Sequence, residues 1–240
     1  MKEIALQKQE LPPRIDAKEE HYKKRNKVFS FFVSLFLTLT IIFTTSYIVV
    51  FSLFSPVYIQ GQSMDPTLND FPVANNIEYR EFGLMNTNKK TLNRGDVAIF
   101  DISPNQTGNY IVKRIIGLPN ETIKIYDGGT NPDYIEITTE NSTFVLEEDY
   151  LKESAHYAIY SGQYATNTAL TLGENQYFAL GDNRGASQDS RNIGPLNSTQ
   201  LKGKLIVIYG YYLDTTSYEG GVSQVTTKKY YYPPWKVRFF

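Results

Sequence analysis

The sequence contains no charged residue from Val28 to Ser63, and this uncharged run constrains the fold more than any other feature. Within it, residues 28–54 are apolar or carry only a hydroxyl group. A helix needs about 20 such residues to cross the roughly 30 Å of hydrocarbon in a bilayer, and serine or threonine hydroxyls can donate to the helix backbone. We therefore expect one N-terminal transmembrane helix over residues 28–54.

The charges beside this run predict its orientation. Four basic residues stand just before it: Lys23, Lys24, Arg25 and Lys27. The next basic residue along the chain is Arg80. By the positive-inside rule, residues 1–27 form a cytoplasmic tail, poorly ordered over about its first 20 residues, and residues 55–240 lie outside the membrane. The alternative is a cleavable signal peptide, which the length of the run and the lack of an A-x-A-like site disfavour.

Composition limits the chemistry that is open to the chain. Hydrophobic residues make up 41% and charged residues 20%, which is typical of a globular domain, and the net charge of −1 does not favour binding to nucleic acid. Cysteine is absent, and only His21 and His156 are histidines. This excludes a disulfide scaffold and a cysteine nucleophile, and it leaves little for a metal site or a Ser-His-Asp triad. A nucleophile in this chain would need another base, and we expect no metal or cofactor.

Residues 55–240 have the pattern of a mostly β, antiparallel domain. Short runs rich in Val, Ile, Tyr and Phe are separated by Asn, Gly, Asp and Pro, and no long segment of helical period competes with them. We expect helical turns in SMDPTLND and NSTQLKGK, a short helix within 150–160, and a small β insertion or cap near 127–173. The end KKYYYPPWKVRFF is interpreted as a final edge strand or as a membrane-surface patch that includes Trp235.

The run YIVKRIIGLP contains a candidate base. A strand places alternate side chains on opposite faces, so Lys113 shares a face with Ile111 and Ile115. Burial on an apolar face disfavours the charged form of a lysine and lowers its pKa, so that it can accept a proton. The alternative is that Lys113 lies on the solvent side of an edge strand, or that its stem runs along an apolar surface with the amine in water.

Two further polar stretches are candidates for the same site. Ser63 stands in GQSMDPTL, where it is either an ordinary turn or N-cap residue or a nucleophile exposed where a strand stops abruptly. The stretch GDNRGASQDSRNIGPL is either a solvated loop closed by an Asp–Arg ion pair or a hydrogen-bonded support for catalytic groups on another loop.

These stretches occur together and in order, and with the single N-terminal anchor the chain resembles the bacterial type I signal peptidases, membrane-anchored Ser/Lys endopeptidases. GQSMDPTL is similar to the nucleophile box of that family, RGDVAIF and YIVKRIIGLPNE to the next two boxes, and GDNRGASQDSRNIGPL to the last. The resemblance covers roughly residues 28–210. A lysine at position 113 favours the bacterial branch, since the endoplasmic-reticulum relatives carry histidine there.

The resemblance implies roles for individual residues. Ser63 would be the nucleophile and Lys113 the general base, with Ser187 orienting the lysine. The supporting residues would be Asp182 and the ion pair of Asp189 with Arg191. The six substrate-binding residues would lie on two strands beside the nucleophile: Val57, Ile59, Gly61, Tyr110, Ile111 and Val112.

Two positions depart from the family pattern. Gram-negative members carry a serine that helps to hold the oxyanion where this chain has Gly61, so the Ser63 backbone N–H would have to serve with a water or another loop. The usual Pro-Gly-Asp turn reads Pro119-Asn120-Glu121 here, and because asparagine tolerates positive φ we expect the same turn.

The implied function is removal of signal peptides from exported preproteins, after small residues of an A-x-A-like site and through an acyl-enzyme. The expected location is a bacterial cell membrane, and the expected partners are signal peptides, membrane lipid and a nearby secretion translocon, without nucleic acid. Three other classes compete. A pseudo-protease should lack the nucleophile or the base, a self-cleaving Ser/Lys repressor should carry a helix-turn-helix and no anchor, and a β-rich adhesion module leaves the lysine on an apolar face unexplained.

Overall fold

The computed structural model describes residues 13–70, 77–88, 91–103, 108–219, 222–234 and 237–240. The chain divides into two compact units, Met1–Phe51 and Ser52–Phe240. Trp235, which the sequence places in the C-terminal patch, lies outside the described residues.

The first unit is formed by one long helix, α1, Pro13–Leu53, of 41 residues. Its part from Lys18 to Leu53 is long and apolar enough to cross a membrane. Hydroxyls inside it donate to carbonyls one turn earlier, as in Thr38 to Ser34 at 2.9 Å and Thr45 to Ile41 at 2.8 Å. These bonds satisfy polar groups that the apolar run would otherwise expose to lipid. The expected disorder of the first 20 or so residues is wrong for residues 13–20, which are helical because proline suits the first position of a helix.

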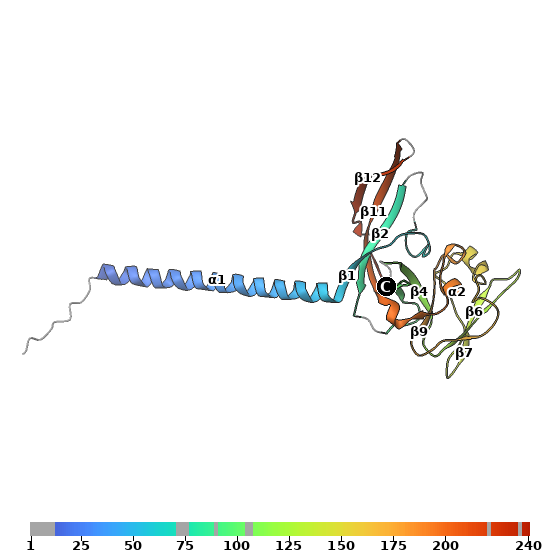
Figure 1. The fold of residues 1–240 in the computed structure, drawn as a ribbon. Coiled ribbons are helices and arrows are strands. Elements are labelled where there is room, and N and C mark those ends of the chain that lie inside the picture. The colour runs from blue at the N-terminus through green and yellow to red at the C-terminus, as the bar shows by residue number, and fades with distance from the viewer. Residues whose placement is uncertain (1–12, 71–76, 89–90, 104–107, 220–221, 235–236) are drawn as a thin grey trace, which may run out of the picture. The chain divides into compact units, whose positions relative to one another are not determined.

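The second unit is built on a curled antiparallel sheet. Nine strands of the described residues form it, in the order β1-β2-β11-β3-β4-β9-β10, with β12 and β13 both paired to β11. The strands are β1 (Phe54–Tyr58), β2 (Ile77–Asn86), β3 (Val97–Asp101), β4 (Tyr110–Gly117), β9 (Gln176–Leu180), β10 (Leu196–Asn197), β11 (Leu201–Glu219), β12 (Val222–Tyr231) and β13 (Arg238–Phe239). Figure 1 shows β12 and the far end of β11 projecting away from β4 and β9.

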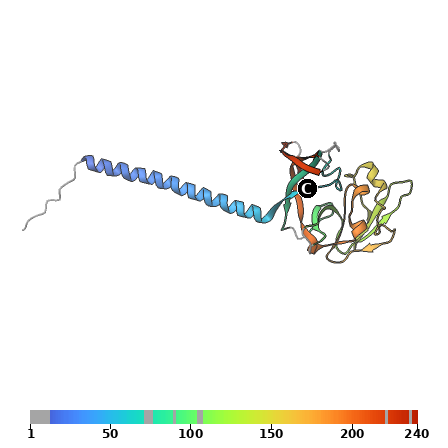
Figure 2. The ribbon, with the colours of Figure 1, turned by 45° about the horizontal axis from the view of Figure 1, so that its top comes forward.

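A smaller sheet packs beside β9, on the side away from β12 (Figures 1 and 2). It has the order β7-β6-β5-β8, from β5 (Thr122–Tyr126), β6 (Tyr134–Thr138), β7 (Thr143–Val145) and β8 (Leu170–Thr171). Its buried isoleucines, on β5 and β6, form one core with Phe178 and Leu180 of β9. This sheet lies in the region predicted as an insertion but starts earlier than residue 127, because β5 pairs with β6 as a hairpin.

Short helical elements complete the second unit: η1 (Glu153–Tyr157), η2 (Arg184–Ala186), α2 (Ser190–Ile193) and η3 (Ser198–Gln200). A helical turn also follows β1, with the Leu68 N–H donating to the Met64 carbonyl at 2.9 Å. The helical segments expected in SMDPTLND, in NSTQLKGK and within 150–160 are therefore confirmed. The expected fold class is confirmed as well, since the chain is one N-terminal apolar helix and a mostly antiparallel β domain.

Candidate active site

Ser63 lies in the turn after β1, and a buried asparagine holds this turn in place. Asn69, which has a positive φ of 57°, donates from Nδ2 to the carbonyls of Ile59 at 3.1 Å and Gly61 at 2.8 Å. Its backbone N–H donates to Glu81 on β2 at 2.9 Å. These three hydrogen bonds pair the polar groups at the base of the loop that carries Ser63. Asn69 and Glu81 were not predicted from the sequence, because no local pattern shows that their side chains meet.

The side chain of Lys113 on β4 meets Ser63. Nζ lies 2.8 Å from Ser63 Oγ and donates to the Val112 carbonyl at 3.0 Å. Only 3% of Lys113 is exposed. Burial lowers the pKa of Lys113 from 10.5 to about 8, opposed in part by the charges of Asp189 and Asp182 and assisted by that of Arg191. The pair thus combines a hydroxyl with an amine that can lose its proton near neutral pH.

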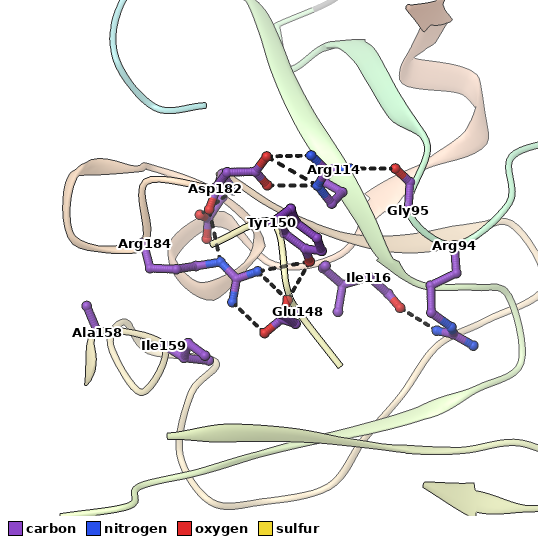
Figure 3. A network of polar contacts seen from close by, with 12 residues as sticks. Arg94, Gly95, Arg114, Ile116, Glu148, Tyr150, Ala158, Ile159, Asp182 and Arg184 are labelled. Carbon is purple, nitrogen blue, oxygen red and sulfur yellow. Dashed lines mark hydrogen bonds and ion pairs between the residues drawn. The ribbon is translucent and has the colours of Figure 1, made fainter. Parts of the chain in front are cut away.

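The loop after β9 fixes both the backbone and the side chains of the Ser63 turn. The Asn183 backbone N–H donates to the Ser63 carbonyl at 3.0 Å, and its Nδ2 donates to the Gln62 carbonyl at 3.1 Å. Asp182 is fully buried and accepts from Thr67 Oγ1 at 2.5 Å. It also accepts from Arg114 Nη2 at 2.6 Å (Figure 3). Arg114 and Thr67 were not singled out from the sequence, since neither stands in a pattern that reveals its distant partner.

Asp189 and Arg191 form a buried ion pair. Arg191 donates from Nε and Nη2 to the two carboxylate oxygens, each at 2.8 Å. Asp189 also accepts from the Gly181 N–H at 3.0 Å and caps α2. Burial alone would raise the pKa of Asp189, but the hydrogen bonds and charge of Arg191 outweigh burial and hold that pKa below its ordinary value. The pair ties the start of the loop, at Gly181, to its end.

Ser187 is half-buried in the same loop, and its Oγ is enclosed beside Gly181. A Cβ on Gly181 would lie 2.2 Å from Ser187 Oγ and 2.4 Å from the Ser63 carbonyl oxygen, so only glycine fits between them. Among the described residues Ser187 Oγ makes no hydrogen bond of good geometry, although its hydroxyl is close enough to Asp189 to help hold the pKa of that carboxyl below its ordinary value. The structure therefore places Ser187 near the Ser63 backbone without a bond to Lys113, and its role in orienting the lysine stays a prediction.

A cleft of about 790 Å³ opens in front of Ser63 and Lys113. All six residues expected to bind substrate line it, together with others that include Tyr58, Met85, Ile99 and Lys202. Within the described part of the chain, β1 pairs only with β2. Strand β4 pairs with β9 only from Arg114 onward, so its residues 110–113 pair with β3 alone. Backbone groups of both strands are therefore open along the cleft.

The backbone at the end of the cleft leaves one donor open. Gly61 has a φ of 81°, and a Cβ there would meet no atom within 4 Å. Among the described residues the Ser63 N–H has no acceptor, while its carbonyl is held by Asn183. An N–H in this position is a candidate donor for an oxyanion that forms on attack by Ser63.

The described residues include no group of three or more His, Cys, Asp or Glu able to hold a metal ion.

The chain is similar to known proteins of one family. The family model described as signal peptidase, peptidase S26, matches residues 30–211. A signal peptidase I of Bacillus licheniformis is 29% identical over 192 residues, covering 77% of this chain and 90% of that protein. A signal peptidase IB of Staphylococcus aureus (strain Mu50 / ATCC 700699) is 28% identical over 178 residues, covering 70% and 84%. A crystal structure of a signal peptidase I from Enterococcus faecalis V583 aligns with 32% identity and a TM-score of 0.35, over 48% of this chain and 97% of that one.

Proposed function

The chain belongs to the signal peptidase family, peptidase S26, and from that premise we propose that it cleaves signal peptides from exported preproteins with a Ser63–Lys113 dyad, through an acyl-enzyme. The observation that carries this proposal is the 2.8 Å separation of Ser63 Oγ from the Nζ of a buried lysine. Such a pair supplies a nucleophile and a base without histidine or metal.

The geometry supports one sequence of proton transfers. Neutral Lys113 takes the proton from Ser63 Oγ as this oxygen attacks the carbonyl carbon of the scissile amide. The resulting ammonium returns the proton to the leaving amine, and the C–N bond breaks to give an ester on Ser63. Lys113 then takes a proton from water as the water oxygen attacks the ester carbon. The ammonium gives this proton to Ser63 Oγ as the ester C–O bond breaks, which releases the signal peptide with a free carboxyl group and restores the neutral lysine and the serine hydroxyl.

The negative charge of each tetrahedral intermediate needs a donor. The Ser63 N–H is suited to this, because it has no acceptor among the described residues and because its own peptide unit is held at the Gln62 carbonyl by Asn183 Nδ2. The two neighbouring peptide units are held at the Gly61 carbonyl by Asn69 and at the Ser63 carbonyl by the Asn183 N–H. Gly61 has no side-chain hydroxyl, so a second hydrogen-bond donor to the oxyanion would come from water or from another loop.

The cleft suits a substrate in extended form. A peptide lying between β1 and the first half of β4 can add as a strand to the open backbone groups of both. Val57 lies on β1, Ile59 and Gly61 follow the end of β1 at Tyr58, and all three line the cleft, which fits shallow apolar pockets for the small side chains of an A-x-A-like site.

The apolar helix and the family together indicate a membrane-anchored protein. We assign the N-terminus to the cytoplasm and the β domain to the outer side, because the basic residues precede the apolar run. In this orientation Ser63, which follows the apolar run closely in the sequence, is on the side of the membrane where a signal peptide emerges. Lipid and a translocon nearby are the corresponding partners.

The test is cleavage of a preprotein with an A-x-A site by the detergent-solubilised full chain, beside Ser63→Ala and Lys113→Ala. We expect the wild type alone to cut, with mass spectrometry placing the cut after the second small residue. Equal cleavage by either variant would refute the dyad. If all three fold and none cleaves, the activity itself is refuted, and a pseudo-protease becomes the better description.

A further inference from the structure

The segment that leads from the second sheet to η1 sends alternate side chains toward the candidate active site. Glu148 contacts Arg184, Tyr150 contacts Arg114, and Lys152 contacts Asp65. These three partners belong to the loop after β9, to strand β4 and to the Ser63 turn. We call residues 148–152 the clamp segment. The elements that carry Ser63, Lys113 and Asp182 therefore each have a contact to this segment.

Glu148 is joined to the loop after β9 by a fully buried ion pair. Glu148 is 5% and Arg184 1% exposed, and Arg184 Nη1 donates to Glu148 Oε2 at 3.1 Å. Arg184 Nε in turn donates to the Gly181 carbonyl at 3.0 Å, and the Arg184 carbonyl accepts from Arg191 Nη2 at 2.8 Å. A buried charge without its partner is costly, so the loop can keep this shape only while Glu148 is in place.

Tyr150 lies between Arg114 and Glu148 (Figure 3). The Arg114 guanidinium carbon is 4.0 Å from the centre of the Tyr150 ring, a cation–π contact. The hydroxyl of Tyr150 donates to Glu148 Oε1 at 2.5 Å, which fixes the ring. Burial and the Glu148 charge raise the pKa of Tyr150, so the hydroxyl keeps its proton. The ring closes one side of the guanidinium, whose Nη2 donates both to Asp182 at 2.6 Å and to Thr67 at 3.1 Å.

Lys152 makes the third, more exposed contact. Its Nζ lies 2.7 Å from Asp65 and 3.4 Å from Asp70. Asp65 follows Ser63 by two positions in the same turn. Because 48% of the Lys152 side chain is exposed, this contact is weaker than the other two and is screened by salt.

We infer that the clamp segment positions the catalytic pair, and that Tyr150 is a positioning residue which acts through Arg114 and Asp182 on the Ser63 turn. This rests on the proposed function and assigns a part in catalysis to the segment that follows β7 of the second sheet. No residue of the clamp segment lines the cleft in front of Ser63. Its loss should therefore lower kcat and leave KM nearly unchanged, and a misplacement of about 1 Å is enough to cost on the order of 100-fold in rate.

The experiment compares three variants of the full chain: Tyr150→Leu, Tyr150→Phe and, as a matched control, Tyr157→Leu. Tyr157 lies in the same part of the chain but is 53% exposed. We expect Tyr150→Leu to lose about 10- to 100-fold in kcat. Tyr150→Phe, which keeps the ring over Arg114, should retain most of the rate, and Tyr157→Leu all of it.

The pH dependence of kcat/KM separates positioning from a loss of folded protein. With Arg114 displaced, the Asp182 charge is less compensated, so it raises the pKa of Lys113 further, in the same direction as Asp189 and against burial and the charge of Arg191. The acid limb should then move to higher pH in Tyr150→Leu, whereas a smaller folded fraction leaves its midpoint unchanged. A reduced rate with an unmoved midpoint, or wild-type rates in Tyr150→Leu, would overturn the inference.

A second variant decides the matter if Tyr150→Leu does not fold. Lys152→Glu changes a half-exposed side chain and sets a negative charge against Asp65 and Asp70. We expect kcat to fall several-fold at low salt and to recover at high salt. An unchanged kcat would contradict the positioning role of the clamp segment. Each comparison requires a wild-type protein that cleaves the preprotein. An inactive wild type would refute the proposed function and not the positioning role of the clamp segment.

Discussion

Replacing Lys113 by methionine should abolish cleavage and at the same time stabilise the β domain. Methionine is close to lysine in length and is apolar, so it can occupy the buried position beside Ser63 without leaving a cavity. The wild-type protein keeps lysine there although burial disfavours its charged form. The substitution removes the free-energy cost of burying a charged lysine, and it also removes the base that catalysis needs.

The size of the effect follows from the pKa of Lys113. The group titrates at 10.5 in the unfolded chain and at about 8 in the fold, and since one pKa unit equals about 1.4 kcal/mol, folding with a charged lysine costs about 3 kcal/mol. The hydrogen bonds to Ser63 and Val112 return about 1 kcal/mol of this. The net gain expected for Lys113→Met at pH 7 is therefore about 2 kcal/mol, or about 4–8 °C in Tm.

The pH dependence of this gain gives it a distinctive signature. Below about pH 8 the lysine is charged in both states, so the wild-type fold carries the whole penalty. Between about pH 8 and 10.5 the folded state loses its proton first, and the penalty disappears as the pH rises. Thermal unfolding of the detergent-solubilised wild type and Lys113→Met, followed from pH 7 to about pH 10, measures the difference. A variant less stable than the wild type at pH 7, or a gain that does not shrink with pH, would refute the reasoning.

Four further expectations follow from the same site. The wild-type kcat/KM should rise about tenfold per pH unit below about pH 8, because only neutral Lys113 is a base, and a flat profile from pH 6 to 8 would contradict this. Lys113→Arg should be folded and without turnover, since a guanidinium does not lose its proton in this range; measurable cleavage would exclude the lysine as base. Ser187→Ala should fold and lose about tenfold or more in kcat, and wild-type turnover would leave the loop after β9 a structural role only. Gly61→Ala should lower the Tm by about 2–4 °C, because its φ of 81° costs a side chain roughly 1 kcal/mol although the space is open, and an unchanged Tm would disprove the strain.

The parts of the fold that were predictable are those set by local pattern. The β-branched and aromatic residues in the runs around Val97 and Tyr110 identify strands, and turn residues divide them. The helix was predictable over the uncharged run, but its start at Pro13 was not, since polar residues continue a helix that the apolar part establishes. The second sheet was recognised only as an insertion, because the partner of β5 lies beyond a loop.

The candidate active site also has parts that were predictable from the sequence and parts that were not. The apolar neighbours of Lys113 allowed burial but also a position on the solvent side of a strand, and its proximity to Ser63 rested on the family resemblance, as no local pattern joins two residues so far apart. Tyr150 and Asn69 act through side chains that meet partners on other elements. An isolated tyrosine or asparagine in a loop has many ordinary uses, so only the tertiary structure reveals these roles.

The central claim is that Ser63 forms an acyl-enzyme with Lys113 as its base, and partitioning with hydroxylamine tests it most directly. The preprotein is cleaved in the presence of hydroxylamine, and the released signal peptide is analysed by mass spectrometry. An acyl-enzyme predicts that a growing share of the peptide carries a C-terminal hydroxamate as hydroxylamine increases, and that Ser63→Ala yields neither product. Efficient cleavage that gives only the free carboxyl group at every hydroxylamine concentration would mean that water attacks the amide directly, and would contradict the dyad mechanism.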